Sequence, residues 1–470
     1  MLTADEESPL LSTTEIDHNA IYNRFTSSQK RIIVAQVSWA GLIPLFVSGS
    51  FVPMIPQIAQ EFDSTGPIIS LAVSLSILAA AVGSLIWATY SGYYGRRPIY
   101  LASLPIYCFG SLGVAVAHTV PELMAWRVIQ SLGASSALSV GAGVIGDIYK
   151  LEERGAAMGV FFGACLLGPA IAPIAGGVAA HLSSWRDMQY ALFLAGVFGF
   201  FTMFAFLPET MAPGSRGFEK YLQVSAEDEG QPSQPWLWLE AFKSLSLLRS
   251  PNILAITIAR SCVLMTDYFL LIPLSYTIGE RYGISNEILI GACFLPAGVG
   301  NIIGSPLAGH ISDKVVVKWR KRRGGVWVPE DRLRATLSGG LILVPMSILL
   351  SGLVTQFIEG RLGLILNLVC LFVNGIGIDF VLSPSSAYYI DVMHSQSAQV
   401  MAASGAVQST FIAVTSTAIL PLINTIGVAG TDALAAFVGW IGFVLIYLTI
   451  RYGEQMRAWA DVGYSTAQTN

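Results

Sequence analysis

The sequence predicts an all-α membrane protein in which twelve transmembrane helices form two pseudo-symmetric halves of six. Apolar residues make up 53% of the chain and charged residues only 12%, about half of the charged share in soluble proteins. Twelve separate stretches are apolar enough to cross a bilayer, and basic residues gather on one side of them. A soluble fold of 470 residues could not solvate its surface with so few charges.

The twelve stretches are identified by their length. A bilayer core about 30 Å thick requires roughly 20 mainly apolar residues in each spanning helix. Helices are predicted because backbone polar groups in lipid must be satisfied within the protein. The predicted spans, in chain order, are 33–56, 66–90, 98–118, 121–147, 156–181, 188–208, 254–278, 288–311, 335–358, 363–386, 399–424 and 431–450.

The placement of basic residues supports the count of twelve. An even number of spans puts both termini on one side, which we assign to the cytoplasm. Of the 26 Lys and Arg residues, 21 then lie in cytoplasmic segments, three lie outside and two lie within helices. This is a strong positive-inside bias. An arrangement of eleven or thirteen spans would put the later basic loops on the wrong side.

The predicted organisation has five parts. They are a polar cytoplasmic N-terminal tail (1–32), an N-terminal six-helix bundle (33–208), a cytoplasmic central loop (209–253), a C-terminal six-helix bundle (254–450) and a cytoplasmic C-terminal tail (451–470).

A short internal repeat supports this division. Gly83-Ser84 is followed seven residues on by Ser91-Gly92, and Gly304-Ser305 is followed in the same way by Ser312-Asp313. Both copies end a helix of equivalent rank and open a basic loop. Parallel six-helix repeats with a substrate path between them are an architecture of alternating access.

Four further stretches resemble one family. The second-to-third-span loop, the fourth span, the fifth span and two short loop segments carry the resemblance, which covers residues from about 30 to 455. In chain order they are Ser91-Gly-Tyr-Tyr-Gly-Arg-Arg-Pro98, Arg127-Val-Ile-Gln-Ser-Leu-Gly133, Gly168-Pro-Ala-Ile-Ala-Pro-Ile-Ala-Gly-Gly177, and the pair Leu207-Pro-Glu-Thr210 and Arg322–Leu333. The chain resembles the major facilitator superfamily, and within it the fungal drug:proton antiporters with twelve spans, of the quinidine-resistance type.

The resemblance assigns gating roles to the loop after the second span. Gly95, Arg96 and Arg97 match the loop signature of the superfamily, but Gly92 stands where that signature has an Asp. The counterpart in the second half keeps the acid as Asp313. We therefore hypothesise that gating at the cytoplasmic side depends on Asp313 and its basic neighbours.

The fifth span resembles the antiporter motif, and its residues have a physical rationale of their own. Gly168, Gly176 and Gly177 remove side chains along the helix, which allows a neighbouring backbone to approach closely. Pro169 and Pro173 each remove a helical donor and bend the axis. A smooth, bent helix suits an interface that moves; ordinary small-residue packing is the alternative.

Charged side chains within the spans are candidates for the transport path, because charge at the bilayer centre is costly. The resemblance implies that Arg127, Asp267 and Asp379 converge on one polar site, with Asn374 near Asp379. Asp267 or Asp379 is the expected proton carrier, and a purely structural interhelical contact is the alternative. Arg260 precedes Asp267 by seven residues and hence shares its face, although it lies near the cytoplasmic end and could extend to the surface.

The first-half cavity helices hold no deeply placed carboxylate, so a neutral, amphipathic or weakly acidic substrate is expected. Asp147 closes the fourth span, and we expect it to pair with Lys150 or Arg154. The five cysteines lie in apolar stretches and predict buried thiols without disulfides.

The sequence therefore predicts a monomeric secondary transporter that exports a small organic compound, such as a secondary metabolite, an organic acid or a xenobiotic, by proton antiport. A nutrient importer or uncoupled facilitator and a non-transporting receptor are the alternatives. No enzyme activity, cofactor, metal or nucleic-acid partner is expected: the five His are scattered and the net charge is only −4. The proton gradient would supply the energy.

The membrane in which the protein resides is expected to be the plasma membrane. Residues Glu6-Glu-Ser-Pro-Leu-Leu11 are similar to an acidic dileucine sorting signal. That signal would instead direct the protein to the vacuole or endosome.

Overall fold

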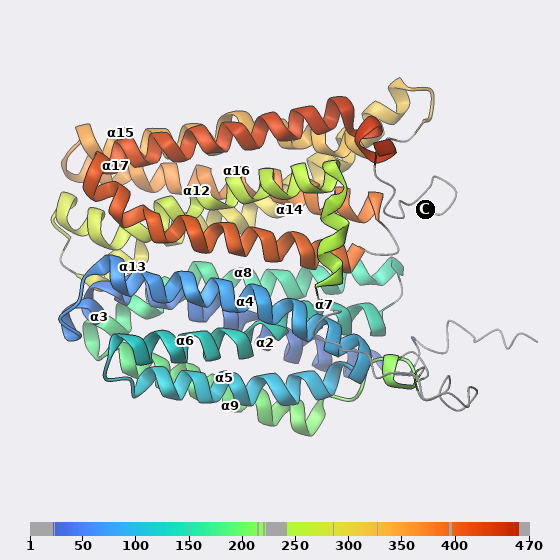
Figure 1. Ribbon diagram of the computed structural model, residues 1–470, viewed down its shortest axis with the longest axis horizontal. Helices are drawn as coiled ribbons and strands as arrows, with labels where there is room; N and C mark the ends of the chain where they lie inside the picture. The colour runs from blue at the N-terminus through green and yellow to red at the C-terminus, as the bar shows by residue number, and fades with distance from the viewer. Residues whose placement is uncertain are drawn as a thin grey trace, which may run out of the picture.

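The computed structural model describes residues 22, 24–149, 151–213, 216–219, 221, 242–284, 286–326, 328–393 and 397–459. Helices account for nearly all of this part of the chain, and no strand occurs in it. The long helices run side by side along one common direction (Figure 1). The predicted all-α membrane fold is confirmed.

The first half consists of six spans. Two of them consist of consecutive helical segments: the first changes to a 3₁₀ turn at Val52–Met54, where Pro53 stands, and the fourth is interrupted at Ser135. The six spans are α2 (Ser27–Phe51) continued by η1 (Val52–Met54) and α3 (Ile55–Glu61), α4 (Gly66–Tyr94), α5 (Arg96–Ala115), α6 (Val120–Ala134) continued by α7 (Ser136–Ile148), α8 (Leu151–Leu182) and α9 (Trp185–Phe206).

The second half begins after a short 3₁₀ segment, η2 (Lys243–Arg249). Its helices are α12 (Pro251–Tyr282), α13 (Glu287–Ala292) continued by α14 (Leu295–Arg322), η3 (Pro329–Thr336) and the π-helical η4 (Gly339–Leu343) leading into α15 (Val344–Phe357), α16 (Gly360–Val392) and α17 (Ser397–Trp459).

The last helix holds two spans. Eleven helical segments of the described chain are long and apolar enough to cross a membrane, and the last of them runs over 61 residues. Gly427 interrupts it with φ 76° and ψ 172°, a conformation that costs a non-glycine residue energy. The parts before and after Gly427 form two separate rods that meet at one end of the bundle (Figure 1). The chain therefore crosses twelve times, as predicted.

The helices extend beyond the apolar stretches that predict them. The largest difference is in α14, which continues to Arg322, whereas the predicted span ends at 311. Hydropathy marks where the lipid ends, and a helix continues past that point as long as its backbone hydrogen bonds continue. The first part of the basic loop is thus a helical extension into water.

The two ends of the bundle differ in charge. We call the end at which α4, α9, α14 and α16 finish the basic end, since Arg96, Arg97 and the basic run 318–323 lie there. The other end carries the connections at 61–66, 182–185 and 357–360 and the break at Gly427.

The halves meet along two seams. Within the first half α2 packs on α8 and α5 on α9, and within the second half α12 packs on α17 and α14 on α16. Between the halves α4 packs on α17, and α8 packs on α13 and α14. Figure 1 shows α8 and α13 in the middle of the bundle.

Glycine contacts bring α8 close to its neighbours on both sides. A Cβ atom on Gly298 would lie 2.5 Å from the Cα atom of Ala170, and one on Gly291 would lie 2.5 Å from the carbonyl oxygen of Pro173. On the opposite side of α8, Gly176 packs directly on the carbonyl of Ser50 of α2. The α8 seam is therefore a contact of backbone against backbone.

The seam between α4 and α17 is polar where it is buried. Ser74 and Ser416 share a hydrogen bond of 2.8 Å, and Thr417 donates to the Ser74 hydroxyl at 3.0 Å. Nearer the basic end, Leu85 of α4 packs on Ala406 of α17. The two halves are thus in contact along both seams.

We expect Gly298→Ala to destabilise the protein by about 1–3 kcal/mol, the usual cost of overpacking, because the added methyl meets the α8 backbone. Gly163→Ala is the matched control: it lies on α8 with open space around it and should stabilise by up to about 1 kcal/mol through helix propensity. Thermal unfolding of the purified proteins measures both effects. Equal shifts for the two variants would contradict close packing at the seam.

Candidate transport site

Two carboxyl groups come together within the second half. Asp267 of α12 and Asp379 of α16 are both partly exposed, and they lie close enough for their charges to interact. Asp379 also packs against α14, where a Cβ atom on Gly304 would lie 3.2 Å from its own Cβ. Its Oδ2 atom is buried without a hydrogen-bond partner.

No cation neutralises this pair of aspartates in the part of the chain that the structure describes: none of the ion pairs there includes Asp267 or Asp379. Carboxylates at membrane depth are costly unless they are paired, hydrated or protonated. The arrangement can therefore bind and release a proton.

Arg127 lies in a separate polar cluster of the first half. Its Nη1 atom donates to Gln130 Oε1 at 2.8 Å, and its guanidinium lies 4.3 Å from the centre of the Phe51 ring. Gln130 in turn donates to Gln189 at 2.9 Å and to Ser111 at 3.0 Å. Within the described residues no hydrogen bond or ion pair joins Arg127 to either aspartate, so the structure brings together two of the three predicted residues.

Arg260 joins α12 to α16 through hydrogen bonds. Only 7% of it is exposed, and its Nη1 atom donates to the Leu382 carbonyl at 2.6 Å and to Ser386 at 2.8 Å. It therefore does not extend to the surface, which the sequence had left open. Asn374 plays a similar part, since its amide donates to Ser347 of α15 at 3.0 Å.

At the basic end of the first half, Arg96 and Glu209 organise the loop before α5. Arg96 pairs with Asp147 at 3.0 Å and donates to Ser91 at 2.8 Å. The observed partner of Asp147 is Arg96; the expected pairing with Lys150 or Arg154 stays a prediction, because the side chains of both lie outside the described residues.

Glu209, from the Leu207–Thr210 segment, caps the start of α5. Its carboxylate accepts from the backbone N–H of Arg96 at 3.0 Å and of Arg97 at 3.2 Å. Gly95 has φ 107°, and a Cβ atom there would lie 2.5 Å from a Glu209 oxygen. A negative charge at a helix N-terminus is favourable. The Arg97 side chain points elsewhere and donates to the Phe204 carbonyl at 3.0 Å.

The second half repeats this arrangement with an additional acid. Arg332 binds Asp391 at 2.6 Å and Asp313 at 3.0 Å. Asp147 and Asp391 end the fourth helix of their respective halves, and each binds an Arg from the start of the preceding span. Asp313 is mainly exposed, at 71% of its side chain, and its observed ion pair is with its own half.

The residues of the fifth-span motif contact both halves. Pro169 and Pro173 are inside α8, and the Pro173 carbonyl faces Gly291 of α13 at the seam. Gly168 packs on Leu45 of α2 in its own half, and Gly177 is buried.

The superfamily model for "Major Facilitator Superfamily" matches residues 37–417. The chain belongs to the Major Facilitator Superfamily. It is similar to the efflux pump radE of Floropilus chiversii, at 27% identity over 89% of this chain and 79% of that protein. It is also similar to citrate exporter 1 of Aspergillus niger, at 28% identity over 62% of this chain and 58% of that protein. The multidrug transporter DTR1 of Candida glabrata is 26% identical over 73% of this chain and 69% of that protein.

Sequence reasoning missed three functional candidates of this superfamily member. Arg332 and Asp391 complete the ion pairs at the basic end, and Asp432 is a buried acid of α17 with 3% exposure. Asp432 could have been found, because it is an acid one residue inside the predicted span 431–450. In the described part of the chain no group of three or more His, Cys, Asp or Glu residues could hold a metal.

We expect Glu209→Gln to destabilise the protein by about 1 kcal/mol, since the uncharged amide leaves one of the two N–H groups at the start of α5 without its charged acceptor. Glu359→Gln is the control, because Glu359 is 74% exposed and pairs with Arg281 at the surface, where ion pairs contribute little. Melting temperatures of the purified variants test this. A smaller loss for Glu209→Gln than for the control would contradict a capping role.

Proposed function

We propose that this member of the superfamily exports a small organic compound in exchange for protons by alternating access. The observation that carries the proposal is the pair Asp267 and Asp379, which interact within the membrane without a cation partner among the described residues. Interacting carboxyl groups titrate as a pair. A proton arriving from outside would neutralise the pair, and its release inside would restore the charge.

The seams between the halves support alternating access. Close backbone contact along α8 allows one half to rock on the other without large side chains in the way. At the basic end, the clusters of Arg96 with Asp147 and of Arg332 with Asp313 and Asp391 each stabilise the loop of one half. Each half can then move as one rigid unit.

Export and the class of substrate are supported by the relatives and by the first half. The similar proteins are named as an efflux pump, a citrate exporter and a multidrug transporter. Arg127, buried over Phe51, is a cation in a half whose other lining groups are neutral amides and hydroxyls. Such a surface suits a neutral, amphipathic or weakly acidic compound.

We further propose that the protein acts as a monomer in the plasma membrane, with no enzyme activity and no bound cofactor. The acidic dileucine segment at 6–11 lies outside the described residues. Imaging of a tagged protein with and without Leu10→Ala and Leu11→Ala distinguishes plasma membrane from vacuole or endosome.

The first test of coupling replaces each aspartate by its isosteric amide. We expect Asp267→Asn or Asp379→Asn to reduce uncoupler-sensitive export about 5- to 150-fold, the factor that corresponds to a typical free energy of coupling between two sites. Export from expressing cells is measured for a panel of organic acids, glycolipids and drugs, with and without an uncoupler.

Glu359→Gln serves as the control for expression and folding, because this acid is exposed. Export that persists in both Asn variants and ignores the uncoupler would instead mean a facilitator, and the aspartates would then be structural contacts. Uncoupler-sensitive accumulation inside the cell would mean an importer.

The test of gating compares Arg332→Met with Asp313→Asn. We expect the Arg332 variant to reduce export several-fold more than the Asp313 variant, because Arg332 binds two acids and its loss breaks both ion pairs, whereas the Asp313 variant breaks one. The same panel measures both. An unchanged rate for Asp313→Asn, together with loss of export in Arg96→Met, would overturn the hypothesis that gating depends on Asp313.

A further inference from the structure

A third uncompensated carboxyl group lies in the second half, next to a small cavity. Asp432 is on the part of α17 after Gly427 and is buried, with 3% of its surface exposed. The cavity has a volume of about 20 Å³, which is room for about one water molecule. Its polar wall consists of Ser351 and Thr355 of α15 and Asn367 of α16, and α12 supplies most of the apolar wall.

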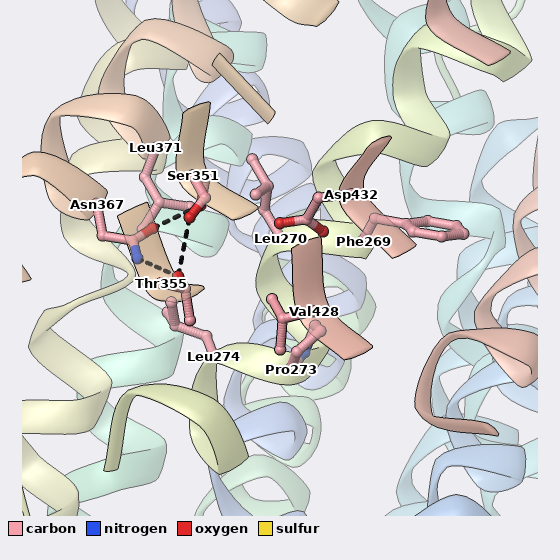
Figure 2. A pocket seen from close by; sticks show the side chains of 10 residues that line it. All are labelled: Phe269, Leu270, Pro273, Leu274, Ser351, Thr355, Asn367, Leu371, Val428 and Asp432. Atoms are coloured by element: carbon pink, nitrogen blue, oxygen red, sulfur yellow. Dashed lines mark hydrogen bonds between the residues drawn. The ribbon is translucent and has the colours of Figure 1, made fainter. Parts of the chain in front are cut away.

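The polar groups of this wall form hydrogen bonds with one another. Ser351 donates to Asn367 Oδ1 at 2.5 Å, the Asn367 amide donates to Thr355 at 2.6 Å, and Thr355 donates to the Ser351 carbonyl at 2.9 Å. Figure 2 shows these groups on one side of the cavity and the Asp432 carboxyl group facing it from the other side. In the described part of the chain the Asp432 carboxyl makes no hydrogen bond or ion pair, although a buried polar group without a partner is costly.

The apolar wall contains a backbone acceptor. Pro273 has no N–H, so the carbonyl of Phe269, four residues earlier, lacks its helical donor. Both residues line the cavity. A protonated carboxyl group, or a single water molecule bound to one, therefore has an acceptor beside the cavity.

The oxygen groups present suit a proton better than a metal cation. Hard cations such as Ca²⁺ and Mg²⁺ take six or more oxygen ligands. Here the hydroxyl and amide groups already bond to each other, and the rest of the wall is Phe, Leu, Pro and Val. A proton requires only the carboxyl oxygen and one acceptor.

The cavity lies on a face of α12 next to that of Asp267. Its lining residues on this helix lie between Phe269 and Leu274 and follow Asp267 by two to seven residues, at about 3 to 10.5 Å along the axis. They are displaced toward the end opposite the basic end. Asp432 thus lies between that end and the pair Asp267 and Asp379.

We propose that Asp432 and this cavity form a second proton-binding site, away from the substrate path, through which protons pass between the end opposite the basic end and Asp267. The passage of protons to Asp267 rests on the proposed function, whereas proton binding at Asp432 does not.

The charged groups around the cavity do not neutralise Asp432. On α12, Arg281 donates to the Thr355 carbonyl and pairs with Glu359, and the Tyr282 hydroxyl accepts from Asn367 at 3.4 Å. Asp267 and Asp379 lie on the neighbouring faces of α12 and α16. Among the residues that line the cavity, Asp432 is the one titratable group of the described chain.

Infrared difference spectroscopy tests the proposal directly and needs no transport substrate. The full chain is purified, reconstituted in liposomes and compared between acidic and alkaline buffer, with exchange into D₂O to identify carboxylic C=O bands. In the double variant Asp267→Asn with Asp379→Asn, we expect one pH-dependent band from a buried carboxyl group to remain. Adding Asp432→Asn should remove that band.

Ser351→Ala is the companion variant, since it keeps Asp432 and removes one hydroxyl from the cavity wall; we expect it to shift the band without abolishing it. Melting temperatures confirm that all variants fold. Identical spectra of the double and triple variants would overturn the proposal. Replacement of choline chloride by NaCl at constant ionic strength should leave the band unchanged, and its loss in NaCl would mean a sodium site instead of a proton site.

The proposed function and this site fail separately. Unaltered, uncoupler-insensitive export in Asp267→Asn and Asp379→Asn would reject proton antiport but leave the Asp432 band intact. Loss of coupling in those variants together with no band from Asp432 would reject this site alone.

Discussion

The exclusion of water from the bilayer core is the constraint on which the rest of this structure depends. It requires that every backbone donor and acceptor at that depth finds a partner inside the protein, which is why the described spans are helices. It also means that a buried ionisable side chain must either be paired with another group or be neutral. The two buried arginines contact neutral groups. Arg127 donates to Gln130 and lies over the Phe51 ring, and Arg260 donates to the Leu382 carbonyl and Ser386. Asp267, Asp379 and Asp432 have no cationic partner in the described chain, so hydration or protonation must offset the cost of their charge.

At the basic end water is present, and there charge is used differently. Each half places an Arg against the acid that ends its fourth helix, Arg96 on Asp147 and Arg332 on Asp391. The first half replaces the additional acid of the second, Asp313, by Gly92, and Arg96 instead donates to Ser91. Glu209 then supplies negative charge from the end of the sixth helix by capping α5. The first half, which has Gly92 in place of an acid, thus has an acid at the start of α5, and this acid comes from a segment distant in sequence.

Most of the fold could be predicted because span length, basic loops and the internal repeat are local properties of the sequence. The twelfth span required only that Gly427 be read as a break. The length of α14 could not be predicted, since hydropathy does not record how far a helix continues into water. The candidate site was predictable in part: Asp267 and Asp379 stand out as acids in apolar stretches. The acceptor of Arg127, Gln130, is three residues on in the same helix. The contact with Phe51 of α2 and the link through Gln130 to Gln189 of α9 could not be predicted, because only the packing brings these helices together.

Within the described spans, the carboxyl groups without a cation partner, Asp267, Asp379 and Asp432, lie in the second half, so under the proposed antiport mechanism proton binding there would act on the first half through the seams. Asp379 packs against Gly304 of α14, and six residues earlier on the same helix Gly298 packs against Ala170 of α8. Both contacts are too close to absorb a movement by side-chain rearrangement, because glycine has no side chain to rearrange. Under the proposed mechanism, a movement of α16 driven by the charge at Asp379 would carry α14 with it and so reach the backbone of α8 in the other half. In this structure α14 contacts both Asp379 and α8, and its glycines leave no side chain between those contacts.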